Sequence, residues 1–225
     1  MARVMGVTAA AVAVVTLAAC ATSVQGRAIK APGETGASAP SASKPGRPPV
    51  AARDLLLQTG DATPLGAATM APVGDSYFTS ARPPECSAAL LFEASPLRPP
   101  GSVDHAESSY RFAGPALYAE AVDVYDNDLN VHDVVWNGFR AISDCRGDAV
   151  GVAPQGQAPP LHLSFFSTGD GVLTWTMTRP DWTCDYGLAA LPRVALMLSA
   201  CDAKPGFPMA DWAAKRRSQI AGRTT

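Results

Sequence analysis

Five cysteines are the residues of this 225-residue chain whose spacing is best suited to chemistry. Cys20 follows Leu-Ala-Ala at the end of an apolar N-terminal stretch, and the other four lie at positions 86, 145, 184 and 201. An even number of cysteines in an exported chain indicates disulfides. The pattern therefore predicts one cysteine available for modification near the N-terminus and two disulfide bonds further along.

The first nineteen residues are typical of a secretory signal peptide. Arg3 provides a positive start, and Val4–Thr16 forms an apolar core of mostly small residues. A transmembrane helix would need about 20 predominantly apolar residues, whereas a cleaved signal needs a shorter core and small residues before the cut. We expect residues 1–19 to be removed.

The Leu-Ala-Ala-Cys sequence resembles the lipobox of bacterial lipoproteins. In that class the cysteine thiol is joined to diacylglycerol, and two or more acyl chains such as palmitate give stable anchoring. The resemblance implies that Cys20 is lipidated and that membrane lipid is a partner. It also implies that the chain lies on the outer face of the cell membrane. The alternative is a plain secretory signal that happens to be followed by a cysteine.

A linker separates Cys20 from the rest of the chain. Within residues 31–49, fifteen of nineteen residues are Ala, Pro, Gly or Ser. Such a segment buries too little apolar surface to offset the entropy of ordering it. We therefore expect a disordered stalk over residues 20–53 and one folded domain over residues 54–225.

Hydrophobic periodicity changes from helical to extended along this domain. Apolar residues at helical spacing predict a helix over Val131–Ile142, and alternation in Leu161–Ser167 and Val172–Thr178 predicts a hairpin. Further elements are expected at Asp54–Gln58 and Cys86–Phe92 (short helices or turns), Ser76–Ser80, Tyr110–Ala113, Leu117–Val124, Trp182–Tyr186 and Val194–Cys201 (strands) and Pro208–Ala221 (helix). This order favours an α+β fold, with an antiparallel β-sheet packed by helices.

Four cysteines allow three disulfide pairings. We choose Cys86–Cys145 with Cys184–Cys201, because Cys184 and Cys201 lie on neighbouring predicted strands. Loop closure at these separations contributes roughly 4 and 3 kcal/mol. A zinc site would normally show close cysteine pairs, whereas the separations here are 59, 39 and 17 residues.

Short segments keep a distinctive order around these cysteines: Pro83–Cys86, a long helix ending at Cys145, Trp182–Cys184, and Ser199–Cys201 before a terminal helix. Over residues 54–221 this order resembles the PknH-like extracellular sensor domain, the outer part of a mycobacterial transmembrane serine/threonine kinase. The same domain recurs in lipoproteins with a lipobox and a stalk. The resemblance implies an α/β domain with an antiparallel sheet, the disulfide pairing above, and a cleft for an unidentified ligand. One departure is Ile142, where the family tends to have tryptophan.

No candidate catalytic residue, metal site or cofactor is predicted. The Ser41–Lys44 match to S-x-x-K lies in the expected stalk, G-x-S-x-G does not occur, and the three histidines lack metal-ligand spacing. His132 beside Asp133 is interpreted as a solvated pair, with a pH-sensitive pair as the alternative. An acidic run from Glu120 to Asp133 is interpreted as the start of a helix, with a calcium site as the alternative.

The net charge of −2 gives no sign of nucleic-acid binding. Together these patterns predict a non-enzymatic sensor or binding lipoprotein whose ligand is a small molecule, a lipid or a cell-wall fragment. Because the chain carries no kinase module, a membrane signalling protein is a further candidate partner. Alternatives are a structural or partner-docking protein and, less favoured, a hydrolase without a recognisable motif.

Overall fold

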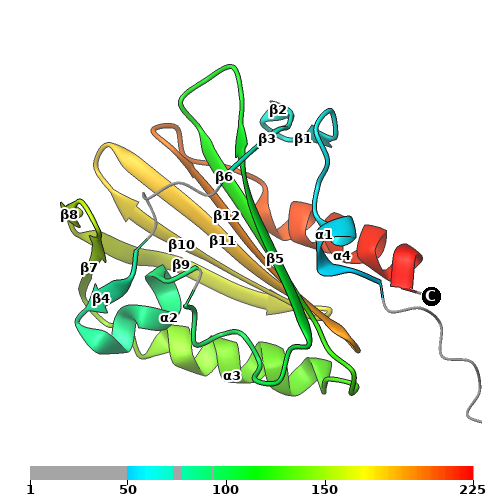
Figure 1. Ribbon diagram of the computed structural model, residues 1–225. Helices are drawn as coiled ribbons and strands as arrows, with labels where there is room; N and C mark the ends of the chain where they lie inside the picture. Colours follow the sequence, from blue (N-terminus) through cyan, green and yellow to red (C-terminus); the bar gives the residue numbers. More distant parts are fainter. Residues whose placement is uncertain (1–49, 73–77, 93, 225) are drawn as a thin grey trace, which may run out of the picture. The chain divides into compact units, whose positions relative to one another are not determined.

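The computed structural model describes residues 50–72, 78–92 and 94–224 (Figure 1). The signal peptide, Cys20 and the stalk up to residue 49 lie outside the described residues, as do the first two residues of the strand expected at Ser76–Ser80. The described strand of this region begins only at Ser80 and ends at Arg82. The described part begins just before a helix that starts at Ala52, two residues before the expected domain boundary. No helix within these ranges combines the length and apolar character needed to cross a membrane.

Helices and strands alternate irregularly along the chain. The helices are α1 (Ala52–Leu55), the 3-10 helix η1 (Pro84–Cys86), α2 (Ser87–Leu90), α3 (Val131–Ser143) and α4 (Met209–Thr224). The large sheet contains β3 (Thr69–Ala71), β4 (Ser80–Arg82), β5 (Asp104–Arg111), β6 (Leu117–Val124), β7 (Asp148–Ala153), β8 (Gly156–Gln157), β9 (Leu161–Gly169), β10 (Val172–Arg179), β11 (Trp182–Leu191) and β12 (Val194–Asp202). Two short strands, β1 (Ala62–Thr63) and β2 (Gly66–Ala67), pair with each other.

The strand order of the large sheet is β3-β5-β6-β12-β11-β10-β9-β7-β4, with β8 paired to β7, and every pairing is antiparallel. Helices α1 and α4 pack on one face of the sheet, and α2 and α3 pack on the other. Because side chains alternate between the faces of a strand, β12 contributes Leu196 and Leu198 to the α1–α4 core and Met197 to the α2–α3 core. The expected antiparallel α+β architecture is confirmed.

The long helix α3 agrees with its prediction. The Asn130 side chain caps its first turn by accepting a hydrogen bond from the backbone N–H of Asp133. Gly138 faces the sheet, where an added Cβ would lie 2.8 Å from a methyl group of Leu173. Glycine therefore allows α3 to approach β10 closely.

The hairpin of β9 and β10 also agrees with its prediction. Asp170 and Gly171 form the turn with φ values of 45° and 77°. Positive φ at both central residues matches the right-handed twist of antiparallel strands and favours this Asp-Gly sequence. The turn therefore sets the register in which Val172 pairs with Gly169.

Strand lengths were the weakest part of the prediction. Strand β11 continues five residues beyond the expected end at Tyr186, because its second half is buried on both faces and shows no alternation. Strand β5 begins at Asp104, six residues before the expected start, in a polar segment. Strand β7 was not predicted, and the helix expected over Cys86–Phe92 is divided between η1 and α2.

Candidate functional site

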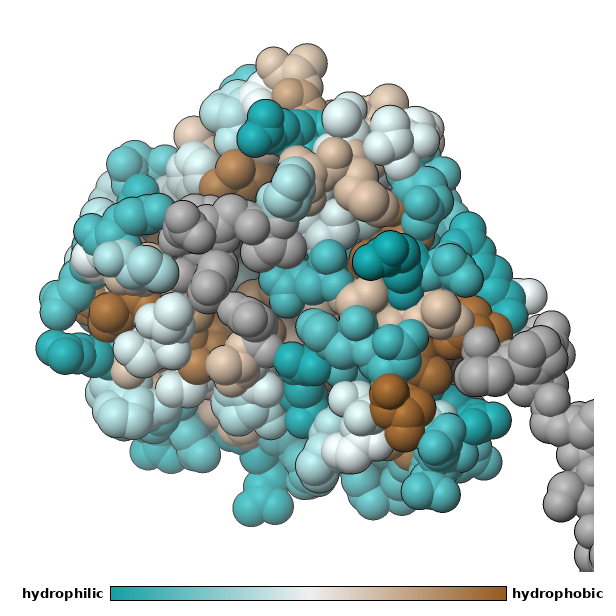
Figure 2. Space-filling view, in the orientation of Figure 1, coloured by the Kyte–Doolittle hydropathy of each residue, from teal (hydrophilic) through white to brown (hydrophobic). Residues whose placement is uncertain are grey.

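A cavity of about 350 Å³ opens on the α2–α3 face of the sheet, and we call it the cleft. Its floor is made by β5, β6, β12 and β11, and the segments that flank α2 supply a wall. The cavity lies within the volume range of ligand pockets. Figure 2 shows a mostly hydrophilic surface with scattered hydrophobic areas, in the orientation of Figure 1.

The register of the strands explains the floor of the cleft. Ser109 of β5 pairs with Ala119 of β6, which pairs with Ser199 of β12, and Ser199 pairs with Tyr186 of β11. Directly opposite residues point to the same face of a sheet. This row therefore crosses four strands and presents two hydroxyl side chains, a methyl group and a phenol ring to the cleft. Burial raises the pKa of the Tyr186 phenol, and the neighbouring Asp185 charge raises it further, so the ring remains neutral.

The next row of the floor contains a disulfide. Leu117 pairs with Cys201, and Cys201 pairs with Cys184, to which it is bonded. The Cα atoms of this pair are 4.0 Å apart. The bond ties β11 to β12 directly beneath the cleft, so two adjacent strands of the floor are covalently joined.

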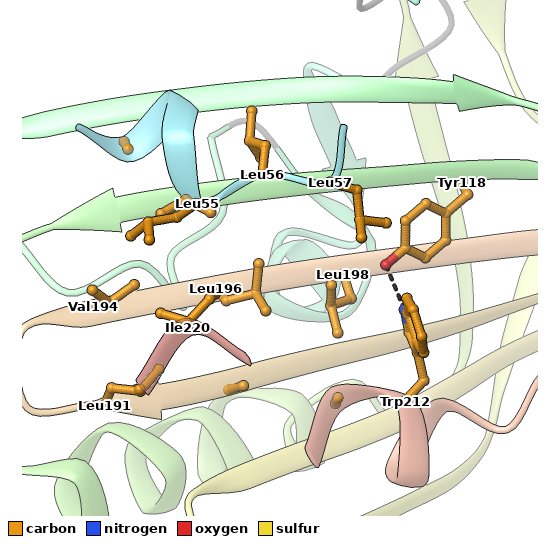
Figure 3. Packing of buried hydrophobic residues seen from close by; sticks show 14 of the residues in the cluster. Leu55, Leu56, Leu57, Tyr118, Leu191, Val194, Leu196, Leu198, Trp212 and Ile220 are labelled. Atoms are coloured by element: carbon orange, nitrogen blue, oxygen red, sulfur yellow. Dashed lines mark hydrogen bonds between the residues drawn. The ribbon is translucent and has the colours of Figure 1, made fainter. Parts of the chain in front are cut away.

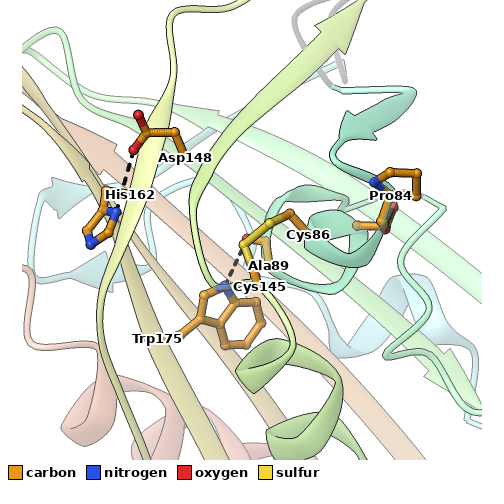
Figure 4. The surroundings of a disulfide bond; sticks show 8 residues. Pro84, Cys86, Ala89, Cys145, Asp148, His162 and Trp175 are labelled. Atoms are coloured by element: carbon orange, nitrogen blue, oxygen red, sulfur yellow. Dashed lines mark hydrogen bonds and ion pairs between the residues drawn. A yellow bond between two sulfur atoms is a disulfide. The ribbon is translucent and has the colours of Figure 1, made fainter. Parts of the chain in front are cut away.

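The second disulfide holds the wall. Cys86 at the end of η1 is bonded to Cys145, two residues after α3 (Figure 4). Beside it, the indole Nε1 of Trp175 donates a hydrogen bond to the carbonyl of Ala89 over 2.9 Å. Both links attach the α2 region to the sheet and to α3. Leu90 and Phe92, which line the cleft, therefore project from a fixed support.

Both disulfides join the cysteines that the sequence analysis paired. The tryptophans divide as core and cleft residues: Trp175 and Trp212 are buried, and Trp182 lines the cleft. Trp136 is half exposed and stacks on Phe139 at the surface of α3. Two of the four tryptophans therefore belong to the core.

Three charged side chains line the cleft. Arg111 at the end of β5 is exposed, and no described residue forms an ion pair with it. The Nε of Arg179 lies 2.9 Å from the carboxylate of Asp181. The carboxylate of Glu107 lies 3.7 Å from Nε2 of His105. Of the cleft's charges, those of Arg179 and Glu107 already have a close polar neighbour on the protein.

The opposite face of the same strands carries a closed polar network. Glu120 and Arg216 are fully buried, and the carboxylate accepts two hydrogen bonds from the guanidinium, over 2.8 and 2.9 Å. Tyr118 donates to Glu120 over 2.8 Å, and Trp212 donates to the Tyr118 oxygen over 2.6 Å (Figure 3). Burial raises the pKa of Tyr118 well above its usual value, and the Glu120 charge adds to this effect.

The network also binds the first described segment of the chain. Arg216 donates to the carbonyl of Leu55, and the backbone N–H of Leu57 donates to Glu120. In Figure 3 the leucines of this segment lie over Leu196 and Leu198 of β12. The chain leaving the expected stalk is therefore fastened to β6 and α4.

These contacts correct the interpretation of the charged runs. Glu120 and Asp123 belong to β6 rather than to a helix N-terminus, and their side chains point to opposite faces. Asp123 accepts hydrogen bonds from Arg98 and lies 3.1 Å from Nδ1 of His105. Within the described ranges, no group of three metal-ligating side chains is close enough to hold an ion. His132 and Asp133 are both exposed and 3.5 Å apart.

The polar cleft residues were missed by the sequence analysis. Ser109, Arg111 and Glu107 come from a strand whose Asp-His-Ala-Glu-Ser-Ser-Tyr-Arg sequence is too polar to resemble a buried strand. The available signal was the alternation of Ala106, Ser108 and Tyr110, which face the α1–α4 core. That alternation implies a strand with its polar residues on the other face.

The chain is similar to known proteins in both sequence and structure. No family model matches the sequence. Proteins named "Putative lipoprotein LprH" from Mycobacterium bovis and from two strains of Mycobacterium tuberculosis are 62% identical over 210 residues, covering 93% of this chain and 90% of theirs. The crystal structure of the extracellular domain of PknH from Mycobacterium tuberculosis matches with a TM-score of 0.62 at 17% identity, covering 77% of this chain and 98% of that one.

The two comparisons carry different conclusions. Identity of 62% over nearly the whole of both chains shows membership of a family. Identity of 17% shows a shared fold and nothing about a shared ligand. The chain thus belongs to the mycobacterial lipoprotein family of LprH, and its domain has the fold of the PknH extracellular domain.

Proposed function

We propose that this chain is an envelope lipoprotein, acylated at Cys20 and held on the outer face of the cell membrane, whose domain binds a ligand in the cleft without transforming it. The cleft is the observation that carries the proposal. Its volume of about 350 Å³ and its largely apolar lining with a few polar groups suit a small-molecule site. The disulfides beneath the floor and behind the wall favour a preformed site, which reduces the entropy that binding would cost.

A binding role is favoured over catalysis by the chemistry of the lining. Ser109 and Ser199 carry the aliphatic hydroxyls of the floor, and the described lining contains none of the three histidines. A serine nucleophile requires a general base within hydrogen-bond reach. Glu107, the carboxylate of the described lining, lies against His105 and is largely buried.

Native mass spectrometry of the protein released from its own envelope tests ligand binding. We expect a bound mass on the native chain that is lost in Ala119→Trp, because the indole would fill the floor between Ser109 and Ser199. The matched control is Ala214→Trp, on the exposed side of α4, which should retain the ligand. A ligand that survives Ala119→Trp would place binding elsewhere, and a native chain without any ligand would contradict the proposal.

The anchor requires a separate test. We expect Cys20→Ala to move the chain from the membrane fraction to the soluble fraction, because the thiol that would carry the acyl groups is lost. On intact cells, protease added outside should cleave the native chain if the domain lies on the outer face. Retention of Cys20→Ala in the membrane fraction would contradict anchoring through this residue.

Partner docking is the second candidate, and the surface of α3 favours it. Trp136 is 50% exposed and stacks on Phe139, whose ring lies 4.9 Å from that of Phe166. Exposed aromatic clusters are typical of interaction sites. Photo-crosslinking from position 136 in intact cells should then capture a partner. A crosslinker placed at a neighbouring position should capture less of that partner when the chain also carries Trp136→Ala. Unchanged capture in that variant would count against this surface.

A further inference from the structure

The interior of the cleft is suited to an apolar chain. Ala119 contributes to its floor, and its lining includes five large apolar side chains: Phe78, Leu90, Phe92, Leu161 and Trp182. Burying apolar ligand surface against such a lining is favourable by about 25 cal/mol per Å². The neutral phenol of Tyr186 adds no charge to this floor.

The mouth of the cleft combines an exposed apolar residue with a cation. Leu117 begins β6, lines the cleft and is 54% exposed. Arg111 ends β5, so both residues stand at the same end of the β5–β6 hairpin. The exposed leucine and the guanidinium give the entrance an apolar group and a cationic group, the two features that a site for an anionic amphiphile requires.

The other charges of the lining favour Arg111 as the head-group contact. Asp181 lies against Arg179 at 2.9 Å and offsets its charge. Glu107 lies on the same face of β5 as Arg111 but four residues away, about 13 Å along the strand. A negative head group is therefore attracted at the mouth and repelled further along β5.

We propose that the ligand of the cleft is an anionic amphiphile, with its apolar chain over the floor and its carboxylate or phosphate head group paired with Arg111. This inference rests on the proposed binding function and specifies its ligand class. A guanidinium forms strong, charge-assisted hydrogen bonds with both kinds of head group. A free fatty acid and a single-chain phospholipid share this chemistry and are the two sources to distinguish.

Probes that differ only in the head group test the proposal. The experiment uses the full chain with Cys20→Ser, which lacks the expected acyl group and therefore needs no detergent that would compete for the cleft. Four probes are titrated below their micelle concentrations: dodecanoate, dodecyl phosphate, dodecanol and dodecyltrimethylammonium. We expect both anions to bind about tenfold or more tightly than dodecanol, and the cation to bind weakest. The ratio of dodecanoate to dodecyl phosphate affinity then distinguishes a fatty acid from a phospholipid.

Arginine variants locate the head group. Arg111→Gln should abolish the preference for anions while leaving dodecanol affinity within about twofold, and Arg111→Lys should restore part of the preference. Arg179→Gln should weaken anion binding less than threefold, because Asp181 already offsets that charge. Arg140→Gln, at an exposed position on α3, is the matched control and should leave all four affinities unchanged.

The position of the chain is tested by fluorescence. Dodecanoate brominated along the chain should quench Trp182, and the quenching should be lost in Trp182→Phe. Unaltered quenching in that variant would place the chain elsewhere and overturn the proposal.

The failure of this inference is distinguishable from failure of the proposed function. Equal affinity for dodecanol and dodecanoate, or tighter binding of the cation, would overturn the anionic class while leaving a ligand-binding cleft. Failure of all four probes alongside a different mass from the native envelope would do the same. Failure of all four probes with no native ligand would overturn both.

Discussion

The two faces of the central sheet use the same strands for different purposes. On the α1–α4 face, β6 contributes Glu120 and Tyr118 to a network in which Arg216 and Trp212 satisfy the buried polar atoms. On the α2–α3 face, the next residue of β6, Ala119, lines an open cleft. Alternation along one strand therefore separates groups that hold the fold from groups available to a ligand.

This division of the two faces predicts where each kind of substitution should act. Buried charges without their partners are expensive, whereas exposed charges contribute little to the free energy of unfolding. We therefore expect changes on the α1–α4 face to affect stability and changes at the cleft to affect binding. The following substitutions test this separation.

Arg216→Ala is expected to have the largest effect. It leaves Glu120 buried without its guanidinium, which should lower the free energy of unfolding by about 3–5 kcal/mol. Urea unfolding monitored by circular dichroism measures it. Lys215→Ala, one residue away, removes a cation that lies over the Trp212 ring at 5.3 Å and should cost less than about 1 kcal/mol.

The double variant Glu120→Leu/Arg216→Met sharpens this test. If an uncompensated charge causes the loss, removing both partners should recover most of it. A double variant as unstable as Arg216→Ala would show that packing and the hydrogen bonds that Glu120 accepts from Tyr118 and Leu57, rather than the lone carboxylate, dominate this face.

The disulfide beneath the cleft should have the next largest effect. Cys184→Ala/Cys201→Ala opens a closure of 17 residues, and the free energy of unfolding should fall by about 3 kcal/mol in the loop-entropy model. Ser199→Ala, on the same floor, is the control and should cost less than about 0.5 kcal/mol. Unchanged stability in the double variant would mean that this bond is not formed in the native chain.

Local patterns predicted the fold better than the site. Alternation and an Asp-Gly turn were sufficient for the β9–β10 hairpin, and helical spacing was sufficient for α3. The strand predicted at Trp182–Tyr186 ended too early, because β11 is buried on both faces in its second half and shows no alternation there. The Glu120–Arg216 pair was missed because its partners are 96 residues apart, and each resembles a surface charge when only its sequence neighbours are considered.

The cleft was harder to predict for a related reason. Its floor is a row across β5, β6, β12 and β11, and that row exists only once the register of three strand pairs is set. The disulfide pairs could be predicted because four cysteines allow only three pairings. No comparable restriction connects Ser109 with Ser199.

Asp185 offers a smaller test, through pH. Burial raises the pKa of this carboxyl, while hydrogen bonds from the Thr176 hydroxyl and the Phe207 backbone lower it less. The folded state therefore binds more protons than the unfolded state at pH values above the ordinary pKa of 3.8 and below the raised one. Stability contributed at low pH is lost as pH rises through that interval.

Asp185→Asn should remove this loss. Urea unfolding at a series of pH values from the ordinary pKa of 3.8 up to neutral pH should show the native chain losing stability relative to the variant as pH rises. Asp170→Asn, in an exposed turn that accommodates asparagine equally, should follow the native chain throughout. A difference between native chain and Asp185→Asn that grows in the opposite direction would contradict the raised pKa.

Arg111→Gln is expected to have the smallest effect on folding. The side chain is exposed and no described residue forms an ion pair with it, so the free energy of unfolding should change by less than about 0.5 kcal/mol. Urea unfolding of this variant beside Arg216→Ala compares one arginine from each face. If Arg111→Gln destabilised the fold as strongly as Arg216→Ala, the charged residue of the cleft would contribute to the free energy of unfolding as much as the buried network does. Its loss of anion binding could then no longer be assigned to a missing contact with the ligand.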